Sequence, residues 1–268
     1  MAKIGVIHYN FPSFSFDQFL RFCKEIGYEY AELSIDDVWN EKDLSDQPEK
    51  KAEQVRRQMD KMGLKVSAVS ARNNFLVSAD EMERQVRRLE RVGSLARILG
   101  TEILRVDGGW PRADIEPSQW VPLIIEGLKR CAEFATRLGV RFALDNHGMV
   151  TNDADRQVAI FEAVNSDRIG ANLDTMNYRW AGHDLDTLRR FYDLVAPYTL
   201  HTHMKDGTGA QQEYRGAALG EGEIPLQYAV GALRKASYRG VWTAEYEGPE
   251  TEGGLGYAKC FKWLKENL

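Results

Sequence analysis

The sequence predicts an α/β protein in which eight parallel strands, each followed by a helix, close into a (β/α)₈ TIM barrel. Three observations predict it. Short apolar runs alternate with longer amphipathic stretches, glycines end several of those stretches, and polar residues follow several of the apolar runs. The chain has 268 residues, close to the roughly 250 that such a barrel needs. We therefore expect residues 1–268 to form a single TIM-barrel domain.

The candidate strands are short apolar runs, each followed by a helical candidate. They are Lys3–Ile7, Tyr30–Leu33, Lys65–Val69, Glu102–Val106, Val140–Leu144, Ile169–Leu173, Tyr198–His203 and Val241–Glu245. Such alternation is typical of right-handed crossovers and a parallel sheet. A doubly wound open sheet shares the alternation, but it concentrates its site at one switch point. Polar residues here follow several strands, which favours the barrel.

The helix boundaries carry their own signals. Ser15 and Ser78 stand where N-caps belong, with acidic residues just after them. Glycine suits the left-handed position just past a helix end. The glycines that end a helical stretch and precede a strand are Gly27, Gly63, Gly100 and Gly139.

Composition excludes several classes of protein. The net charge is −5 and no basic stripe stands out, which opposes a nucleic-acid partner. No apolar run reaches the roughly 18 residues of a membrane span. The three cysteines, Cys23, Cys131 and Cys260, are far apart and form no CxxC pair, as expected for buried thiols in a reducing cytosol. We expect a cytoplasmic protein with a small-molecule substrate, and association into a homo-oligomer is left open.

Four of the later strands end in polar residues. Because alternate residues of a strand share a face, Asp145, Asp174 and Glu245 are expected to point into the barrel, and His203 and Lys205 share one face of the seventh strand. Any one acid could simply cap the next helix. Three carboxylates in one barrel mouth would be very costly without a cation. The pattern therefore predicts a bound metal ion.

Four motifs make the resemblance to a known family specific. Gly170–Thr175, His201–Asp206, Leu219–Ile224 and Val241–Glu247 resemble motifs of the sugar phosphate isomerase/epimerase family, in the xylose isomerase-like TIM-barrel superfamily. The resemblance covers nearly the whole chain and is densest from residue 140 onward.

That resemblance implies a metal held by Asp145, Asp174, His203 and Glu245. The family usually has Glu where this chain has Asp145, and this shorter side chain weakens the expectation of a symmetric two-glutamate mechanism. Three carboxylates and one imidazole suit Mn²⁺ or Mg²⁺, with Co²⁺ or Zn²⁺ as alternatives.

The expected catalytic residues are Asp145, Glu245 and His147. Either carboxylate could remove a proton, and His147 could act as an acid/base or only hold a neighbour by a hydrogen bond. Lys205 and Arg215 could offset negative charge and bind substrate oxygens.

Other candidates for substrate binding are aromatic. Trp110 could wall a sugar ring or merely pack in its loop, and His183 stands near a helix start. Glu32 and Arg105 also have inward parity, and we expect them to pair with each other.

The leading functional hypothesis is an isomerase or epimerase acting on a ketose or keto-sugar. It would abstract the proton alpha to the carbonyl and pass through a cis-enediolate. The alternative is a dehydratase or lyase on a keto-cyclitol or keto-glycoside with the same metal site, in which His147 protonates the leaving oxygen. Endonucleases that share the fold need more than the five histidines present. A non-enzymatic sugar-binding module would not need an open metal flanked by two candidate bases.

Overall fold

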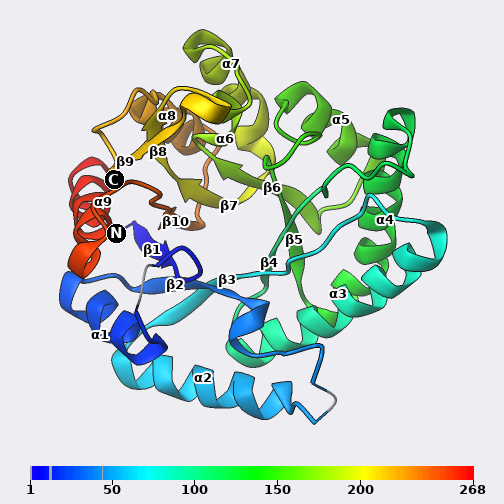
Figure 1. Cartoon of the computed structure of the whole chain (residues 1–268), viewed down its shortest axis with the longest axis horizontal. Helices are drawn as coiled ribbons and strands as arrows, with labels where there is room; N and C mark the ends of the chain where they lie inside the picture. The colour runs from blue at the N-terminus through cyan, green and yellow to red at the C-terminus, as the bar shows by residue number, and fades with distance from the viewer. Residues whose placement is uncertain (1, 12–13, 44) are drawn as a thin grey trace.

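The computed structural model describes residues 2–11, 14–43 and 45–268. Eight parallel strands form its centre: β1 (Lys3–Ile7), β2 (Tyr30–Ser34), β3 (Lys65–Ser70), β4 (Ile103–Val106), β5 (Arg141–Asp145), β6 (Ile169–Asp174), β7 (Thr199–Met204) and β10 (Val241–Ala244). They close in the order β1-β10-β7-β6-β5-β4-β3-β2 (Figure 1). The predicted TIM barrel is confirmed, and the predicted strand bounds agree to within one residue at each end. That residues 1–268 make a single domain stays a prediction.

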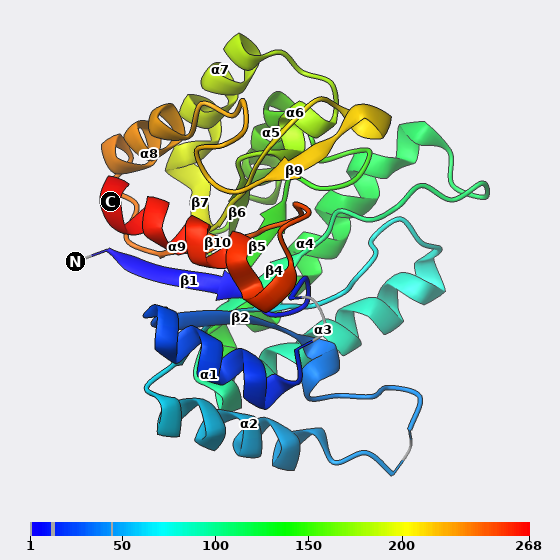
Figure 2. The same ribbon diagram turned by 60° about the vertical axis from the view of Figure 1, so that its left-hand side comes forward.

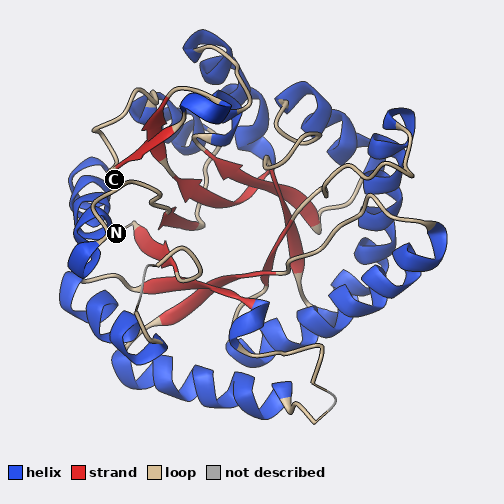
Figure 3. Ribbon diagram, in the orientation of Figure 1, coloured by secondary structure: helices blue, strands red, loops and turns tan. Residues whose placement is uncertain are grey.

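Helices surround the strands on the outside of the barrel (Figure 3). They are α1 (Phe16–Ile26), α2 (Pro48–Met62), α3 (Ala79–Leu99), α4 (Trp120–Leu138), α5 (Ala154–Val164), α6 (Asn177–Trp180), α7 (Leu185–Val195), α8 (Leu226–Lys235) and α9 (Leu255–Asn267). Seen from the side in Figure 2, α1 and α2 lie outside β1 and β2. Within the described part of the chain, no helix is long and apolar enough to cross a membrane.

The helix ends form where the sequence predicts them. The hydroxyl of Ser15 accepts from the backbone N–H of Gln18, and the backbone N–H and hydroxyl of Ser78 both donate to Glu81. At the other ends, Gly27 (φ 104°) and Gly100 (φ 91°) adopt the left-handed conformation that glycine tolerates best. These caps fix the points at which the chain turns back into each strand.

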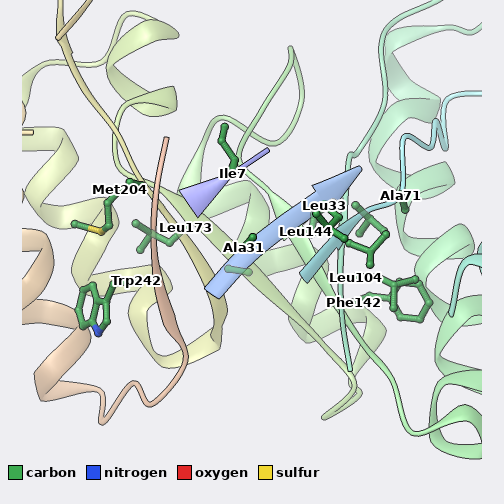
Figure 4. Packing of buried hydrophobic residues seen from close by; sticks show 14 of the residues in the cluster. Ile7, Ala31, Leu33, Ala71, Leu104, Phe142, Leu144, Leu173, Met204 and Trp242 are labelled. Carbon is green, nitrogen blue, oxygen red and sulfur yellow. The ribbon is translucent and has the colours of Figure 1, made fainter. Parts of the chain in front are cut away.

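The alternation of side chains along each strand separates the core from the site. Outward residues pack beneath the helices, as Figure 4 shows for Leu33, Leu104, Phe142, Leu144 and Leu173. Inside the barrel, a small apolar cluster of Ala68, Ile103 and Ala143 is covered by Leu200. Since Leu144 and Leu173 face the helices, the next residues, Asp145 and Asp174, face the barrel interior.

A two-stranded hairpin follows β7 that the sequence analysis did not predict. It consists of β8 (Asp206–Thr208) and β9 (Arg215–Ala217), paired antiparallel. The Asp206 carboxylate accepts four backbone N–H groups, from Gly207, Gly220, Gly222 and Ile224, at 2.8–3.1 Å. A Cβ on Gly222 would lie 2.1 Å from Asp206 Oδ1, so only glycine fits beside this carboxylate. The glycine-bearing loop is thus tied to the end of β7.

Candidate metal centre

Three predicted metal ligands meet at the C-terminal ends of neighbouring strands. Asp174 ends β6, His203 is in β7, and Glu245 directly follows β10. Each offers a ligand atom within 4.8 Å of the other two, and all three residues are buried. The register explains the convergence, since Asp174 and Thr243 both lie opposite His203 in the adjacent strands.

Two atoms of this cluster are buried without a hydrogen-bond partner. Asp174 Oδ1 accepts from the backbone N–H groups of Met176 and Asn177, at 2.7 and 2.9 Å, whereas Asp174 Oδ2 has no partner. His203 Nδ1 lies 2.8 Å from Glu245 Oε2, but the contact lacks hydrogen-bond geometry, and Nδ1 has no partner either. Orphaned buried polar atoms are costly, and each needs an explanation. Carboxylate oxygens and an imidazole nitrogen turned to one point fit a divalent cation.

Asp145, the fourth predicted ligand, lies outside this 4.8 Å group. It ends β5 and is ion-paired through Oδ2 with Arg105 of the neighbouring strand β4, while Oδ1 has no partner. Its ligand atoms group instead with those of Asp107 and His147. The expected pairing of Arg105 with Glu32 is wrong. Arg105 pairs with Asp145 and with Asp107 at 3.3 Å, because these two carboxylates stand beside it on β5 and at the end of β4.

Glu32 instead reaches the histidines of β7. Its Oε2 lies 2.8 Å from His201 Nε2 and 2.7 Å from His203 Nε2, and its Oε1 accepts from the Tyr9 hydroxyl at 3.1 Å. Although burial opposes ionisation, the two histidines hold the pKa of the Glu32 carboxyl far below its usual range. His201 lies deeper in the barrel and is within 3.3 Å of the Thr243 hydroxyl.

Lys205 neutralises the opposite side of the cluster. Its Nζ lies 3.1 Å from Glu245 Oε1 and 2.7 Å from Glu247 Oε2. Asn10 adds a second donor, since its side-chain amide donates to Glu245 at 3.1 Å and to Glu247 at 3.3 Å. Glu245 is therefore held by neighbours on one oxygen and turned towards His203 with the other.

The environment shifts the pKa values of the two carboxyl groups of the cluster in opposite directions. Burial raises the pKa of Asp174 to about 7, although Lys205 opposes this shift. Burial would also raise the pKa of Glu245, but Lys205 and His203 outweigh it and hold that pKa well below the usual range. Burial likewise opposes the charge of His203, yet Glu32 and Glu245 keep its pKa well above the ordinary value. The charged form of Asp174 is therefore the one that its neighbours compensate least, and a bound cation would stabilise it.

A cavity of about 180 Å³ opens beside the cluster. It is walled by residues at or after strand C-terminal ends: Tyr9, Asn10, Arg72, Arg105, Asp107, Trp110, Asp145, His147, Asn177, Lys205, Glu245 and Glu247. Trp110 and His147 form its outer wall, with ring centroids 5.5 Å apart and an interplanar angle of 84°. Five predicted site residues thus border one cavity: Trp110, Asp145, His147, Lys205 and Glu245.

Arg215 and His183, both expected to bind substrate, do not border this cavity. Arg215 begins β9 and its side chain is exposed. His183 precedes α7, where its ring packs edge-on against Phe191 and its Nε2 lies 3.1 Å from the Asn152 carbonyl oxygen. The geometry favours a packing role for His183.

Several residues at this cavity were missed by sequence reasoning. Asp107 directly follows β4, just as Asp145 ends β5. A search for acidic residues of inward parity at strand ends, applied to β4, would therefore have found it. Glu247 shares the face of Glu245 at i+2. Tyr9 and Asn10 lie just after β1 in a short loop without a distinctive pattern, and only the closed barrel brings them to Glu32 and Glu245.

A second cavity, of about 570 Å³, lies at the opposite end of the barrel. Residues at the strand N-terminal ends line it, among them Lys3, Tyr30, Thr101 and Arg141. Of the residues described at the candidate metal centre, His201 alone lines this second cavity. Catalytic sites of TIM barrels lie at the other face, so this larger cavity is not the candidate centre.

A closed (β/α)₈ barrel with a buried carboxylate–imidazole cluster at its C-terminal mouth defines an enzyme fold with a candidate metal centre. The chain belongs to the xylose isomerase-like TIM-barrel family, whose sequence model matches residues 20–267. The resemblance expected from the motifs is thereby confirmed. No curated protein matches the chain by sequence.

Solved structures agree in fold at low identity. The IOLI protein with a bound zinc atom has a TM-score of 0.78 at 18% identity, over 99% of this chain and 96% of that one. D-psicose 3-epimerase from Clostridium cellulolyticum H10, solved with D-tagatose, has a TM-score of 0.76 at 14% identity, over 99% and 98%. The probable 3-DHS dehydratase AsbF from Bacillus anthracis has a TM-score of 0.74 at 16% identity, over 98% of each chain. These likenesses show the shared fold, and an epimerase and a dehydratase both occur among the neighbours.

Proposed function

We propose that this protein is a divalent-metal-dependent isomerase or epimerase of a ketose or keto-sugar. The observation that carries the proposal is the cluster of Asp174, His203 and Glu245, in which Asp174 Oδ2 and His203 Nδ1 have no hydrogen-bond partner and Glu245 borders a cavity of about 180 Å³. The family to which the chain belongs and the epimerase among its structural neighbours support the reaction class.

Asp174, His203 and Glu245 would hold the metal, and the unpartnered Oδ1 of Asp145 would join them from β5. The donor set favours Mn²⁺, with Mg²⁺, Co²⁺ and Zn²⁺ as alternatives. When bound, the cation would polarise the substrate carbonyl and its neighbouring hydroxyl as a Lewis acid.

The proton alpha to the carbonyl would be taken by Glu245 or Asp145, the two carboxylates that both border the cavity and belong to the proposed ligand set. Each is restrained by a cation, Glu245 by Lys205 and Asp145 by Arg105, which fixes the direction of its remaining oxygen. Lys205 would then stabilise the charge that develops on the enediolate, because this residue borders the cavity. Trp110 would supply an apolar wall for the sugar ring.

Elimination is the second candidate, and the position of His147 favours it. Its side chain is 42% exposed, and its Nδ1 lies 4.0 Å from Asp107 Oδ1. A histidine at the rim of the cavity could protonate a leaving oxygen on the substrate. The dehydratase among the structural neighbours is consistent with this reaction.

Isotope exchange tests both candidates together. The Mn²⁺-loaded protein would be incubated in D₂O with a panel of ketoses, keto-cyclitols and 3-keto-glycosides, and the products followed by NMR and mass spectrometry. We expect deuterium at the carbon alpha to the carbonyl with an unchanged oxygen count. A conjugated product that absorbs in the ultraviolet, formed only from substrates with a β-leaving group, would establish elimination instead.

Two controls define the site of reaction. Glu245→Gln should abolish exchange at every metal concentration, whereas Arg215→Ala, outside the cavity, should leave it unchanged. Neither exchange nor elimination with any member of the panel, from protein shown to contain metal, would contradict the proposed reaction class.

A further inference from the structure

We propose that Glu32 is a positioning residue that orients the His203 ring and keeps the proton on Nε2, so that Nδ1 faces the metal centre. The inference concerns the same site and rests on the proposed role of His203 as a ligand. Glu32 belongs to β2, which is not a neighbour of β7 in the barrel. Its side chain therefore crosses the barrel interior to reach His203.

The carboxylate of Glu32 is fully engaged by three donors. Oε2 receives both imidazole Nε2 atoms, from His201 at 2.8 Å and His203 at 2.7 Å, and Oε1 receives the Tyr9 hydroxyl at 3.1 Å. Glu32, His201 and His203 are all at most 1% exposed. Both oxygens of the carboxylate are therefore held by hydrogen bonds, Oε2 by two imidazoles and Oε1 by a phenol.

In this arrangement the two ring nitrogens of His203 have different roles. A carboxylate oxygen that contacts two ring nitrogens can only accept, so Nε2 of His203 must carry hydrogen. Nδ1 is the nitrogen that faces the carboxylates, 2.8 Å from Glu245 Oε2 and 4.0 Å from Asp174 Oδ2, and it lacks a hydrogen-bond partner. A histidine that ligates a metal commonly donates its second N–H to such a carboxylate, which fixes ring orientation and tautomer.

His201 completes the arrangement from one layer deeper. It shares the same Glu32 oxygen, and its ring lies at 79° to that of His203 with centroids 5.8 Å apart. Its Nε2 also lies 3.3 Å from the Thr243 hydroxyl, so its position is fixed from β10 as well. His201 therefore anchors Glu32, and Glu32 in turn anchors His203.

NMR of the wild-type protein tests the central claim without a variant. The chain has five histidines, so ¹⁵N-histidine labelling gives a resolvable spectrum. We expect slowly exchanging Nε2–H signals from His201 and His203, both without metal and with diamagnetic Mg²⁺ or Zn²⁺. If the retained proton of His203 were on Nδ1, the proposal would be overturned whatever reaction the protein catalyses.

Metal binding of variants tests the consequence. Glu32→Gln keeps the size of the side chain but replaces the anionic acceptor by a neutral amide oxygen, which binds the two Nε2–H groups more weakly. We expect a 10- to 100-fold loss of affinity for Mn²⁺ by calorimetry, as is typical for such partners. Glu32→Asp should bind metal more weakly than wild type as well, since the shorter chain cannot reach across the barrel. Tyr9→Phe is the matched comparison, because it removes only the hydrogen bond to Oε1 and leaves both imidazole contacts of Oε2, so it should lower the affinity less than Glu32→Gln does.

A positioning role predicts that metal affinity and kcat respond differently to substitution. Saturating Mn²⁺ should restore much of the kcat of Glu32→Gln but none of the kcat of Glu245→Gln. Wild-type affinity for Mn²⁺ in Glu32→Gln would contradict the proposal. If this variant does not fold, judged by circular dichroism, the wild-type NMR result alone decides.

Discussion

Arg105 on β4 is ion-paired with Asp145 at the end of β5, and the two side chains are nearly or fully buried. The Arg105 guanidinium also lies 3.3 Å from Asp107, so it is shared by two carboxylates. One oxygen of Asp145 contacts that guanidinium, and the other, Oδ1, has no hydrogen-bond partner.

The first prediction concerns the stability of this pair. Arg105→Met should lower the free energy of unfolding by about 3–5 kcal/mol, because it leaves the Asp145 carboxylate buried without its partner. Urea unfolding in the absence of divalent metal measures it. The double variant Arg105→Met/Asp145→Asn should recover a large part of the loss, since the uncompensated charge is gone. A single variant as stable as wild type would show that the pair has no such importance.

The second prediction concerns metal content. Asp174→Asn and His203→Ala should each lose most of the bound metal, because each removes a donor that points into the cluster. Elemental analysis after dialysis measures it, with His183→Ala as the matched histidine control. Full metal content in both site variants would show that the ion is bound elsewhere.

The third prediction separates chemistry from metal binding at His147. His147→Ala should keep its metal and lose roughly 10²- to 10⁴-fold in turnover if this histidine transfers a proton. Turnover and metal content are measured on the same preparation. A loss of activity that tracks a loss of metal would instead give His147 the role of a supporting hydrogen bonder.

The fourth prediction uses the N-terminus of α3, whose Glu81 does not border the candidate cavity. Hydrogen bonds from Ser78 and Arg112 lower the pKa of Glu81 from 4.5 to about 2. The unfolded chain therefore takes up this proton first as the pH falls. The stabilisation by ionised Glu81 is complete above about pH 4.5 and is lost as the pH falls through about 2.

Thermal unfolding of wild type and Glu81→Gln measures this dependence. The difference in melting temperature should be full at pH 6–7 and should shrink steadily on acidification below about pH 4.5. Glu133→Gln, at an exposed position of α4, supplies the control for the removal of one surface carboxylate. A difference that grew with acidification would mean that the sign is wrong.

The fold was predictable because its signals are local. Ser15 and Gly27 mark the two ends of α1 within the sequence itself, and the alternation Leu173–Asp174 assigns one residue to the helices and the next to the barrel interior. The hairpin of β8 and β9 was missed because its strands have three residues each, too short for a periodic pattern. It is held by the backbone contacts of Asp206, which no sequence pattern reveals.

The candidate site was predictable only in part, for a geometric reason. Strand parity places Glu32, Arg105, Asp145 and His203 inside the barrel but does not say which of them meet. That depends on the tilt of the strands and on side-chain length, which allow Glu32 to reach β7 rather than β4. Parity therefore identified the participants, whereas the pairing of Arg105 with Asp145 required the three-dimensional structure.

The hydrogen bond between Glu32 and His203 also limits how the protein can be divided. The recognisable motifs all follow residue 140, yet the residue that receives the His203 ring stands on the second strand, 171 positions earlier in the chain. A fragment that contains only the later strands would carry every ligand and still lack the acceptor for His203. The early and late strands thus both contribute to holding His203. A fragment without the first strands should regain an ordered His203 ring only when the missing segment is supplied in trans.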